Sequence, residues 1–170
     1  MPYPEQLVKP MREELTRIGV KELRDASAVD DSFTNASGKT QLLIINSVCG
    51  CAASNARPAV TLAQQSEIQP DEMITVFAGQ DIEATARSRE YLAGIPPSSP
   101  FIALLSSGEP VFVLERRHIE GRSASAIAMD LVKAYETHCG TNGQATEGRA
   151  AETSPSEDQD SVPPTFKSIL

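Results

Sequence analysis

The sequence predicts an α/β protein with a mixed four-stranded sheet, helices on both faces and an extra helix at the N-terminus. The segment 41–46 holds four consecutive aliphatic residues, which is typical of a strand buried on both faces. Strand-like and helix-like segments then alternate, which favours parallel pairing through a right-handed crossover. The last two strand-like segments are joined by a tight turn and must therefore be antiparallel.

The N-terminal segment is expected to form the extra helix. Its apolar residues recur at spacings of four, four and three, and Gly19 is placed to end it as a C-cap. This stripe consists of Leu7, Met11, Leu15 and Ile18. Pro10 lacks a backbone donor and is expected to kink or restart the helix. Residues 25–38 are polar and turn-rich, so we expect at most a short helical turn anchored by Val29 and Phe33.

The remaining elements alternate along the chain. Pro58 should interrupt the helix that follows the first strand, and Asp81 and Ser123 are plausible N-caps of the next two helices. In chain order the expected elements are a strand at 41–46, a helix at 52–65, a strand at 73–78, a helix at 81–92, a hairpin of strands at 101–105 and 111–115, and a helix from 123 to about 139.

The charge of the chain excludes several classes of partner. The chain has 170 residues and 15 basic against 23 acidic side chains, so its net charge is -8. This argues against nucleic acid and against an anionic membrane surface, both of which attract clustered basic side chains. The longest aliphatic run, 42–45, is too short to span a bilayer, and the N-terminus resembles no signal peptide. We therefore expect a cytoplasmic protein.

The composition changes after Gly140. Residues 141–170 are rich in Ser, Thr, Pro, Gly and acidic residues, with almost no large apolar side chain. Such a segment buries too little surface to offset the entropy of ordering it. We therefore expect one domain at 1–140 and a disordered acidic tail at 141–170.

Two of the three cysteines, Cys49 and Cys51, are separated only by Gly50. Cys49 follows the predicted buried strand and precedes a predicted helix. Amide groups at a helix N-terminus stabilise a thiolate over a thiol and lower its pKa. Because no Lys, Arg or His lies nearby in sequence, the helix terminus should supply most of this effect unless a distant residue folds in.

A disulfide between Cys49 and Cys51 would close a very small ring. Disulfides prefer Cα atoms about 5.5 Å apart, which one intervening residue makes difficult to reach. Gly50 relieves part of the strain because it can adopt unusual dihedral angles. Strained disulfides are easily reduced, so such a pair is suited to exchanging disulfides.

Two other interpretations of the cysteines remain open. Free cysteines are often small, inert core residues. The pair could also hold Cu(I) or half of a zinc site, completed by Cys139, His138 or His118. Structural zinc sites usually have two to four residues between their cysteines, and the other candidate ligands lie far along the chain.

With these motifs in view, residues 3–139 resemble the bacilliredoxin family of the thioredoxin superfamily. The segments that carry the resemblance are Pro10-Met11-Arg12-Glu13-Glu14-Leu15, Asn46-Ser47-Val48-Cys49-Gly50-Cys51-Ala52-Ala53, Ala56-Arg57-Pro58-Ala59, Phe77-Ala78-Gly79-Gln80-Asp81, Pro96-Pro97-Ser98-Ser99-Pro100 and His118-Ile119-Glu120-Gly121-Arg122. The resemblance implies a thioredoxin-like fold in which Pro100 is a cis-proline beside the cysteines. The backbone of Ser99 would then pair with an extended substrate. The alternative is an ordinary proline at the entry to a strand.

The resemblance also implies a reaction, the removal of bacillithiol from protein mixed disulfides. Cys49 would attack and take the bacillithiol, and either free bacillithiol or Cys51 would then release Cys49. Besides bacillithiol as thiol co-substrate no cofactor or metal is implied, and the expected partners are S-bacillithiolated client proteins and a disulfide reductase. A general disulfide isomerase or reductase is the competing enzyme.

Three further residues are weaker candidates. Arg57 is expected either to bind a substrate carboxylate or to be solvated. His118 is either a general base or, more plainly, a surface or capping residue. Cys139 is expected to pack the last helix.

Overall fold

The computed structural model describes residues 2–140, so the expected tail at 141–170 lies outside the described residues. A mixed five-stranded sheet has the order β1-β3-β2-β4-β5. Strands β1, β3 and β2 are parallel to one another. β4 runs antiparallel to β2, and β5 runs antiparallel to β4 and therefore in the same direction as β2. The strands are β1 (Lys21–Glu22), β2 (Thr40–Asn46), β3 (Glu72–Phe77), β4 (Phe101–Ser106) and β5 (Glu109–Leu114).

The expectation of four strands was wrong by one edge strand. β1 has two residues and pairs with β3 through Lys21 opposite Ile74. The backbone N–H of Leu23 continues this pairing by donating to the carbonyl of Thr75 at 2.9 Å. A strand this short has no readable alternation of apolar and polar residues, so its position depends on the neighbouring strand.

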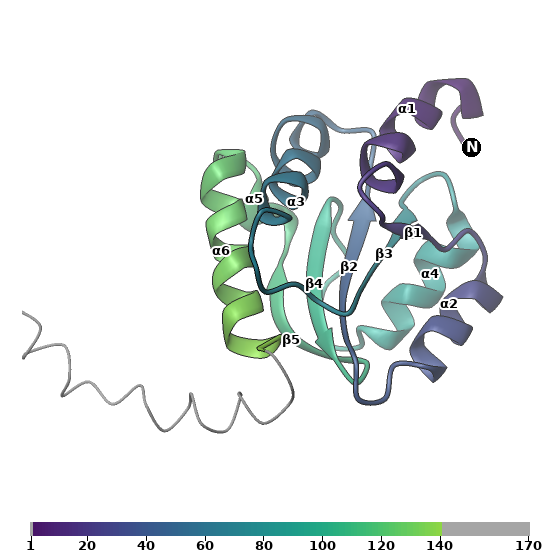
Figure 1. The fold of residues 1–170 in the computed structure, drawn as a ribbon. Helices are drawn as coiled ribbons and strands as arrows, with labels where there is room; N and C mark the ends of the chain where they lie inside the picture. The colour runs from purple at the N-terminus through teal and green to yellow at the C-terminus, as the bar shows by residue number, and fades with distance from the viewer. Residues whose placement is uncertain (1, 141–170) are drawn as a thin grey trace, which may run out of the picture.

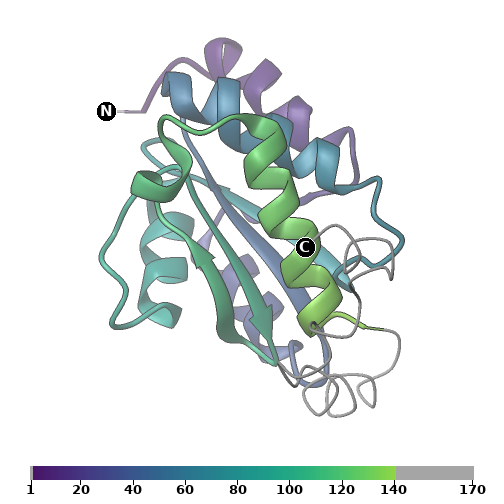
Figure 2. The same ribbon diagram turned by 90° about the vertical axis from the view of Figure 1, so that its left-hand side faces the viewer.

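Helices cover both faces of the sheet (Figure 1). α3 and α6 lie together on one face with the C-terminal end of α1, and α2 and α4 lie on the other. Figure 2 shows the long α6 running diagonally over the strands. The helices are α1 (Glu5–Thr16), α2 (Ala26–Thr34), α3 (Arg57–Ala63), α4 (Ile82–Tyr91), α5 (Arg116–Ile119) and α6 (Ala124–His138), with a π-helical segment η1 (Ala52–Ala56) before α3.

The central strand β2 separates two hydrophobic cores. Leu42 and Ile44 face the core beneath α3 and α6, whereas Leu43 and Ile45 face the core beneath α2 and α4. All four side chains are buried, which confirms the prediction of a strand buried on both faces. With this strand order and two helical layers, the protein has a thioredoxin-like fold, as the resemblance implied.

Several local expectations need correction. α1 runs through Pro10 without a break, and α2 is a full helix where only a turn was expected. α5 was not expected at all. Asp81 occupies the N-cap position of α4 but makes no cap bond, because its carboxylate accepts from Arg12 at 2.7 and 2.9 Å instead. Ser123 does cap α6, since its hydroxyl accepts from the N–H of Ala126.

The interruption expected at Pro58 is present. The π-helical segment η1 ends two residues before this proline, and the α-helical pattern of α3 begins at Arg57. Proline cannot donate a hydrogen bond to the carbonyl four residues back, and π-helical turns often accommodate such breaks. The whole stretch from Gly50 to Ala63 is nevertheless helical.

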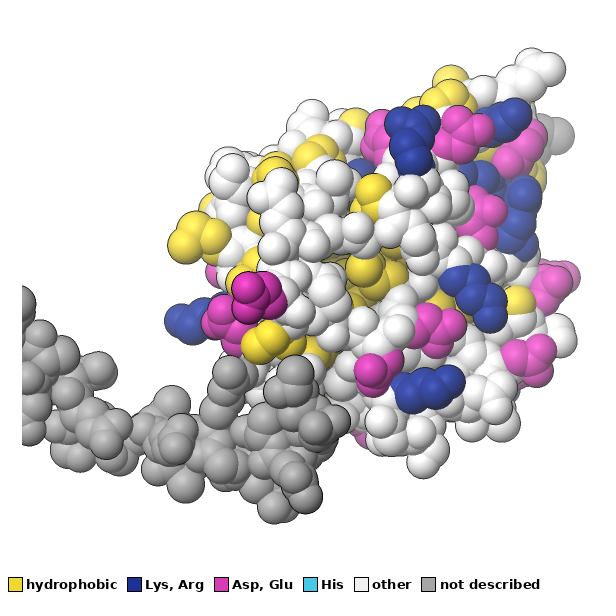
Figure 3. Space-filling view, in the orientation of Figure 1, with side chains coloured by type: hydrophobic (Ala, Val, Ile, Leu, Met, Phe, Trp, Pro, Cys, Tyr) yellow, Lys and Arg dark blue, Asp and Glu magenta, His cyan; other side chains and the backbone are white. Residues whose placement is uncertain are grey.

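A charged cluster fastens α1 to the rest of the domain. Arg12 is 6% exposed, and its guanidinium pairs with Asp81 and Glu5 and lies 5.2 Å from the centre of the Phe77 ring. Figure 3 shows acidic and basic side chains interleaved over this part of the surface.

In the described part of the chain no helix is long and apolar enough to cross a membrane.

Candidate active site

The two cysteines of the Cys-Gly-Cys motif lie where β2 passes into a helix. β2 ends at Asn46, and helical structure begins at Gly50. The carbonyl of Cys49 accepts hydrogen bonds from the backbone N–H groups of Ala52 and Ala53 at 3.1 and 3.2 Å. Cys49 therefore lies at the start of the helix, as the sequence predicted, and its side chain is partly exposed.

The sulfur of Cys49 is surrounded by hydrogen-bond donors. Its Sγ lies 2.8 Å from the Sγ of Cys51, and the Ser47 hydroxyl donates to it at 3.1 Å. Burial opposes ionisation, but donation from Cys51, Ser47 and the backbone N–H groups of Ala52 and Cys51 outweighs it. The pKa of Cys49 is therefore lowered, which favours the thiolate that acts as nucleophile.

Cys51 has the opposite character. Burial raises its pKa, and the hydrogen bond and negative charge of Cys49 raise it further. The positive charge of Arg116 offsets only part of this effect. All three cysteines are free thiols. The opposite pKa shifts of Cys49 and Cys51 favour Cys49 as the attacking thiol and Cys51 as the resolving thiol.

Gly50 does not use its conformational freedom in this dithiol state. Its φ lies outside the left-handed region, and a Cβ atom placed on it would meet no heavy atom within 4 Å. The unusual dihedral angles expected of this glycine are therefore not seen while both cysteines are reduced.

The Ser99–Pro100 peptide bond is cis, as the resemblance implied. Ile45 of β2 lies opposite Phe101 of β4, so Pro100 lies beside the end of β2 from which the cysteines follow. Pro100 is buried and Ser99 is partly exposed. The carbonyl of Ser99 accepts a hydrogen bond from Arg116 Nη1 at 3.4 Å, so it is not wholly free to pair with a substrate.

Arg57 is neither solvated nor directed at solvent. It is 2% exposed, and its guanidinium pairs with the carboxylate of Glu14. It also donates to the side-chain carbonyl of Asn46 at 2.9 Å and the backbone carbonyl of Ser47 at 3.0 Å. The structure thus places Arg57 beneath the loop that carries Cys49, where it positions the loop through Asn46 and Ser47.

The remaining sequence candidates lie away from the sulfur pair or are held by local bonds. His118 forms a capping box with Glu115 at the start of α5, in line with the capping interpretation. Cys139 packs against the core at the end of α6, as expected, and burial raises its pKa. Its thiol lies near Thr40, at the start of β2. At about 3.3 Å per residue, Thr40 is about 20 Å from Asn46, the other end of this strand, after which Cys49 follows. No group of three or more potential metal ligands occurs within residues 2–140.

Sequence reasoning missed two residues of the site. Ser47 lies two residues before Cys49, and a hydroxyl this close in sequence to a thiol was an available signal. Arg116 lies at the start of α5, far from the cysteines along the chain, and only the fold brings it to them. No sequence pattern indicated it.

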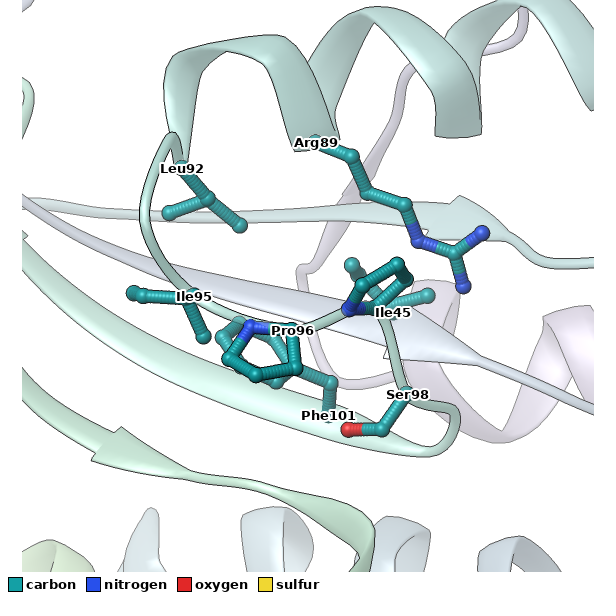
Figure 4. A pocket seen from close by; sticks show the side chains of 8 residues that line it. Ile45, Arg89, Leu92, Ile95, Pro96, Ser98 and Phe101 are labelled. Carbon is teal, nitrogen blue, oxygen red and sulfur yellow. The ribbon is translucent and has the colours of Figure 1, made fainter.

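A small hollow lies behind the proline-rich segment that leads to Pro100. Arg89 extends from α4 along one side, beside Ile45, and Pro96 and Ser98 form the other side (Figure 4). Its volume of about 10 Å³ is only enough for a single water. This hollow is therefore too small to hold a thiol substrate.

Comparison with known proteins shows the family of this chain. A family model described as disulphide isomerase matches residues 3–139. A Salinibacter ruber protein named bacilliredoxin is 56% identical over 170 residues, covering 99% of both chains. The chain belongs to the bacilliredoxin family.

Other relatives match a smaller share of this chain. A Bacillus cereus bacilliredoxin is 49% identical over 138 residues, which make up 95% of that protein and 81% of this chain. A solved thioredoxin from Fasciola hepatica covers 68% of this chain and 99% of its own, with a TM-score of 0.48 and 17% identity. This bacilliredoxin-family protein is a thiol–disulfide oxidoreductase.

Proposed function

We propose that this protein removes bacillithiol from S-bacillithiolated client proteins, with Cys49 as nucleophile. The observation that carries the proposal is the asymmetric sulfur pair, in which Cys49 has a lowered pKa and Cys51 a raised one. The relatives named bacilliredoxin supply the class of substrate. Because the reaction needs free thiols, we infer that it takes place in the reducing cytoplasm.

The first step is thiol–disulfide exchange. The Cys49 thiolate attacks the bacillithiol sulfur of the mixed disulfide, so a bond forms between Cys49 and bacillithiol while the bond between bacillithiol and the client breaks. The client cysteine leaves as a thiolate and takes up a proton. The Ser47 hydroxyl donates to Cys49 Sγ, the Cys51 sulfur lies 2.8 Å from it, and both contacts lower the pKa of Cys49 and so favour its thiolate before the attack.

The second step restores bacillithiol. Cys51 loses its proton and attacks Cys49 Sγ, which is already in contact with it. Bacillithiol leaves as a thiolate, and a disulfide remains between Cys49 and Cys51. Two electrons from a disulfide reductase or from free bacillithiol return the pair to the dithiol state.

Intact-mass analysis tests the assignment of the two cysteines. The Cys51→Ser variant, mixed with oxidised bacillithiol, should retain one bacillithiol adduct that maps to Cys49. Cys49→Ala should take up no adduct and should not release bacillithiol from a client. An adduct on Cys51 in the Cys49→Ala variant, together with retained turnover, would show that the nucleophile is assigned to the wrong residue.

General disulfide isomerisation is a second candidate, favoured by the description of the family model that matches residues 3–139. The two functions differ in their need for bacillithiol. Recovery of activity from a scrambled multi-disulfide protein, measured beside removal of bacillithiol from a single-cysteine client, separates them. Efficient isomerisation with negligible removal of bacillithiol would favour the second candidate.

A further inference from the structure

Arg116 brings a positive charge to the sulfur pair from a distant part of the chain. Its backbone N–H donates to the Ser98 hydroxyl at 3.2 Å, and its Nη1 donates to the Ser99 carbonyl at 3.4 Å. The charge also acts on Cys51, whose pKa it lowers against the larger opposing effects. The guanidinium is therefore bound to the segment that ends in the cis-proline, and this segment lies beside the end of β2 from which the cysteines follow.

Arg116 is only loosely engaged by acidic side chains. Its side chain is 46% exposed, and its ion pair with Glu120 spans 3.6 Å, with Glu120 itself 61% exposed. Exposed ion pairs of this kind contribute little and exchange readily with other anions. The buried arginines of the domain, by contrast, are held by closer carboxylates, as Arg12 is by Asp81 at 2.7 Å.

A loosely held guanidinium beside a thiol-exchange site is suited to bind carboxylates. Its planar fork of donors matches both oxygens of a carboxylate, and it remains charged at any physiological pH. A small thiol joined to Cys49 lies next to Cys51, whose sulfur is 2.8 Å from Cys49 Sγ. Groups attached to that thiol are then within the neighbourhood of Arg116.

We propose that Arg116 is a specificity-determining residue, which binds a carboxylate of the low-molecular-weight thiol held as a mixed disulfide on Cys49. The inference rests on the proposed function, because bacillithiol is such a carboxylated thiol. It also accounts for how a protein with a net charge of -8 accepts an anionic substrate. A local cation offsets the repulsion that the whole chain exerts on an acidic thiol.

The experiment compares two mixed disulfides of one single-cysteine client, one with bacillithiol and one with the uncharged thiol 2-mercaptoethanol. We measure kcat/KM for each. Arg116→Gln should lower the value for bacillithiol about tenfold or more, the size expected for a lost charged hydrogen bond, and change the value for the uncharged thiol little. Arg116→Lys should retain part of the preference.

Arg117 provides a matched control. It is the next residue, is 76% exposed, and pairs with Glu115 rather than with the Ser99 segment. Arg117→Gln removes the same net charge and should leave the ratio between the two substrates unchanged. A thermal unfolding midpoint for each variant checks that the fold is intact.

Two outcomes would overturn the inference. If Arg116→Gln lowers kcat/KM equally for both substrates, the residue acts through Cys51 or through the fold. If Arg117→Gln changes the ratio between the two substrates as much as Arg116→Gln does, only net charge matters. A third substrate, the glutathione mixed disulfide, separates this inference from the proposed function. If the parent releases glutathione but not bacillithiol, the proposed function fails, while loss of glutathione release in Arg116→Gln would still support the carboxylate site.

Discussion

At the scale of single residues, the chemistry of the site depends on which atoms donate to Cys49 Sγ. Two of these donors, the Ser47 hydroxyl and the Cys51 thiol, belong to side chains. The others are backbone N–H groups of the helix start. Because the side-chain donors can be removed one at a time, their contribution to the lowered pKa is measurable.

Cys51→Ala should raise the pKa of Cys49, because it removes a thiol that donates to the Cys49 sulfur. Cys51→Ser keeps a donor and should raise it less. A higher pKa means that the thiolate appears only at higher pH, so the pH midpoint for alkylation by iodoacetamide should move upward in the order parent, Ser, Ala. Mass spectrometry of Cys49 alkylation gives this midpoint, and identical midpoints in the two variants would contradict the role of the Cys51 donor.

Replacement of Arg57 distinguishes positioning from substrate binding. Arg57→Gln leaves the carbonyls of Asn46 and Ser47 without their buried donor and should lower the free energy of unfolding by about 2–3 kcal/mol. Urea denaturation measures this loss. Arg17→Gln, at a 74% exposed position, is the control and should change stability by less than about 0.5 kcal/mol. A raised KM for bacillithiol with unchanged stability would instead assign Arg57 to the substrate.

At the scale of elements, the helix that follows Cys49 and the helix α1 are held in place by different interactions. The segment from Gly50 onward is helical, and its first turns bury the small side chains of Ala52 and Ala56. α1 instead depends on ion pairs, since Arg12 joins it to Asp81 at the start of α4. Pro10 is tolerated inside α1 while these pairs and the buried Val8 and Leu15 hold the helix in place.

The acidic partner of Arg12 in α1 makes stability depend on pH. The hydrogen bond from Arg12 lowers the pKa of Glu5, and this outweighs burial, which acts in the opposite direction. A carboxylate with a lowered pKa stabilises the fold above its unfolded pKa of about 4.3 and loses this contribution as pH falls through its folded value. The parent should therefore lose more stability than Glu5→Gln on going from pH 5 to pH 3.

Urea midpoints at the two pH values measure the difference. Glu13→Gln is a suitable control on the same helix, because the closest ion pairs of Glu13 span 3.9 and 4.0 Å. It should show the same pH dependence as the parent. A Glu5→Gln variant as acid-sensitive as the parent would show that this pair contributes nothing measurable to stability.

At the scale of the whole molecule, we propose that residues 1–140 fold and act without residues 141–170. The two hydrophobic cores and the sulfur pair lie entirely within the described residues, 2–140. A chain that ends at Gly140 should keep the thermal unfolding midpoint and the kcat/KM of the full chain. A lower midpoint, or a loss of turnover on a bacillithiolated client, would assign a structural or functional role to the removed segment.

The amino-acid sequence by itself determined the elements with strong local patterns. β2, β3, the β4–β5 hairpin and α6 follow from aliphatic runs, turn residues and a capping serine, which act within a few residues of each other. The Cys-Gly-Cys motif after a buried strand also predicted a reactive thiol. β1, α2 and α5 were missed or underestimated, because short polar segments adopt these structures only against neighbours that the fold supplies.

Only the tertiary structure decided how the charged residues are used. Arg57 and Arg116 are both arginines beside the site, but the first is buried and donates to the backbone of the Cys49 loop, whereas the second is exposed and donates to the Ser99 carbonyl. Asp81 looked like a helix cap and instead holds Arg12. A long charged side chain has many partners within reach, and which one it meets depends on strand order and burial rather than on its neighbours in sequence.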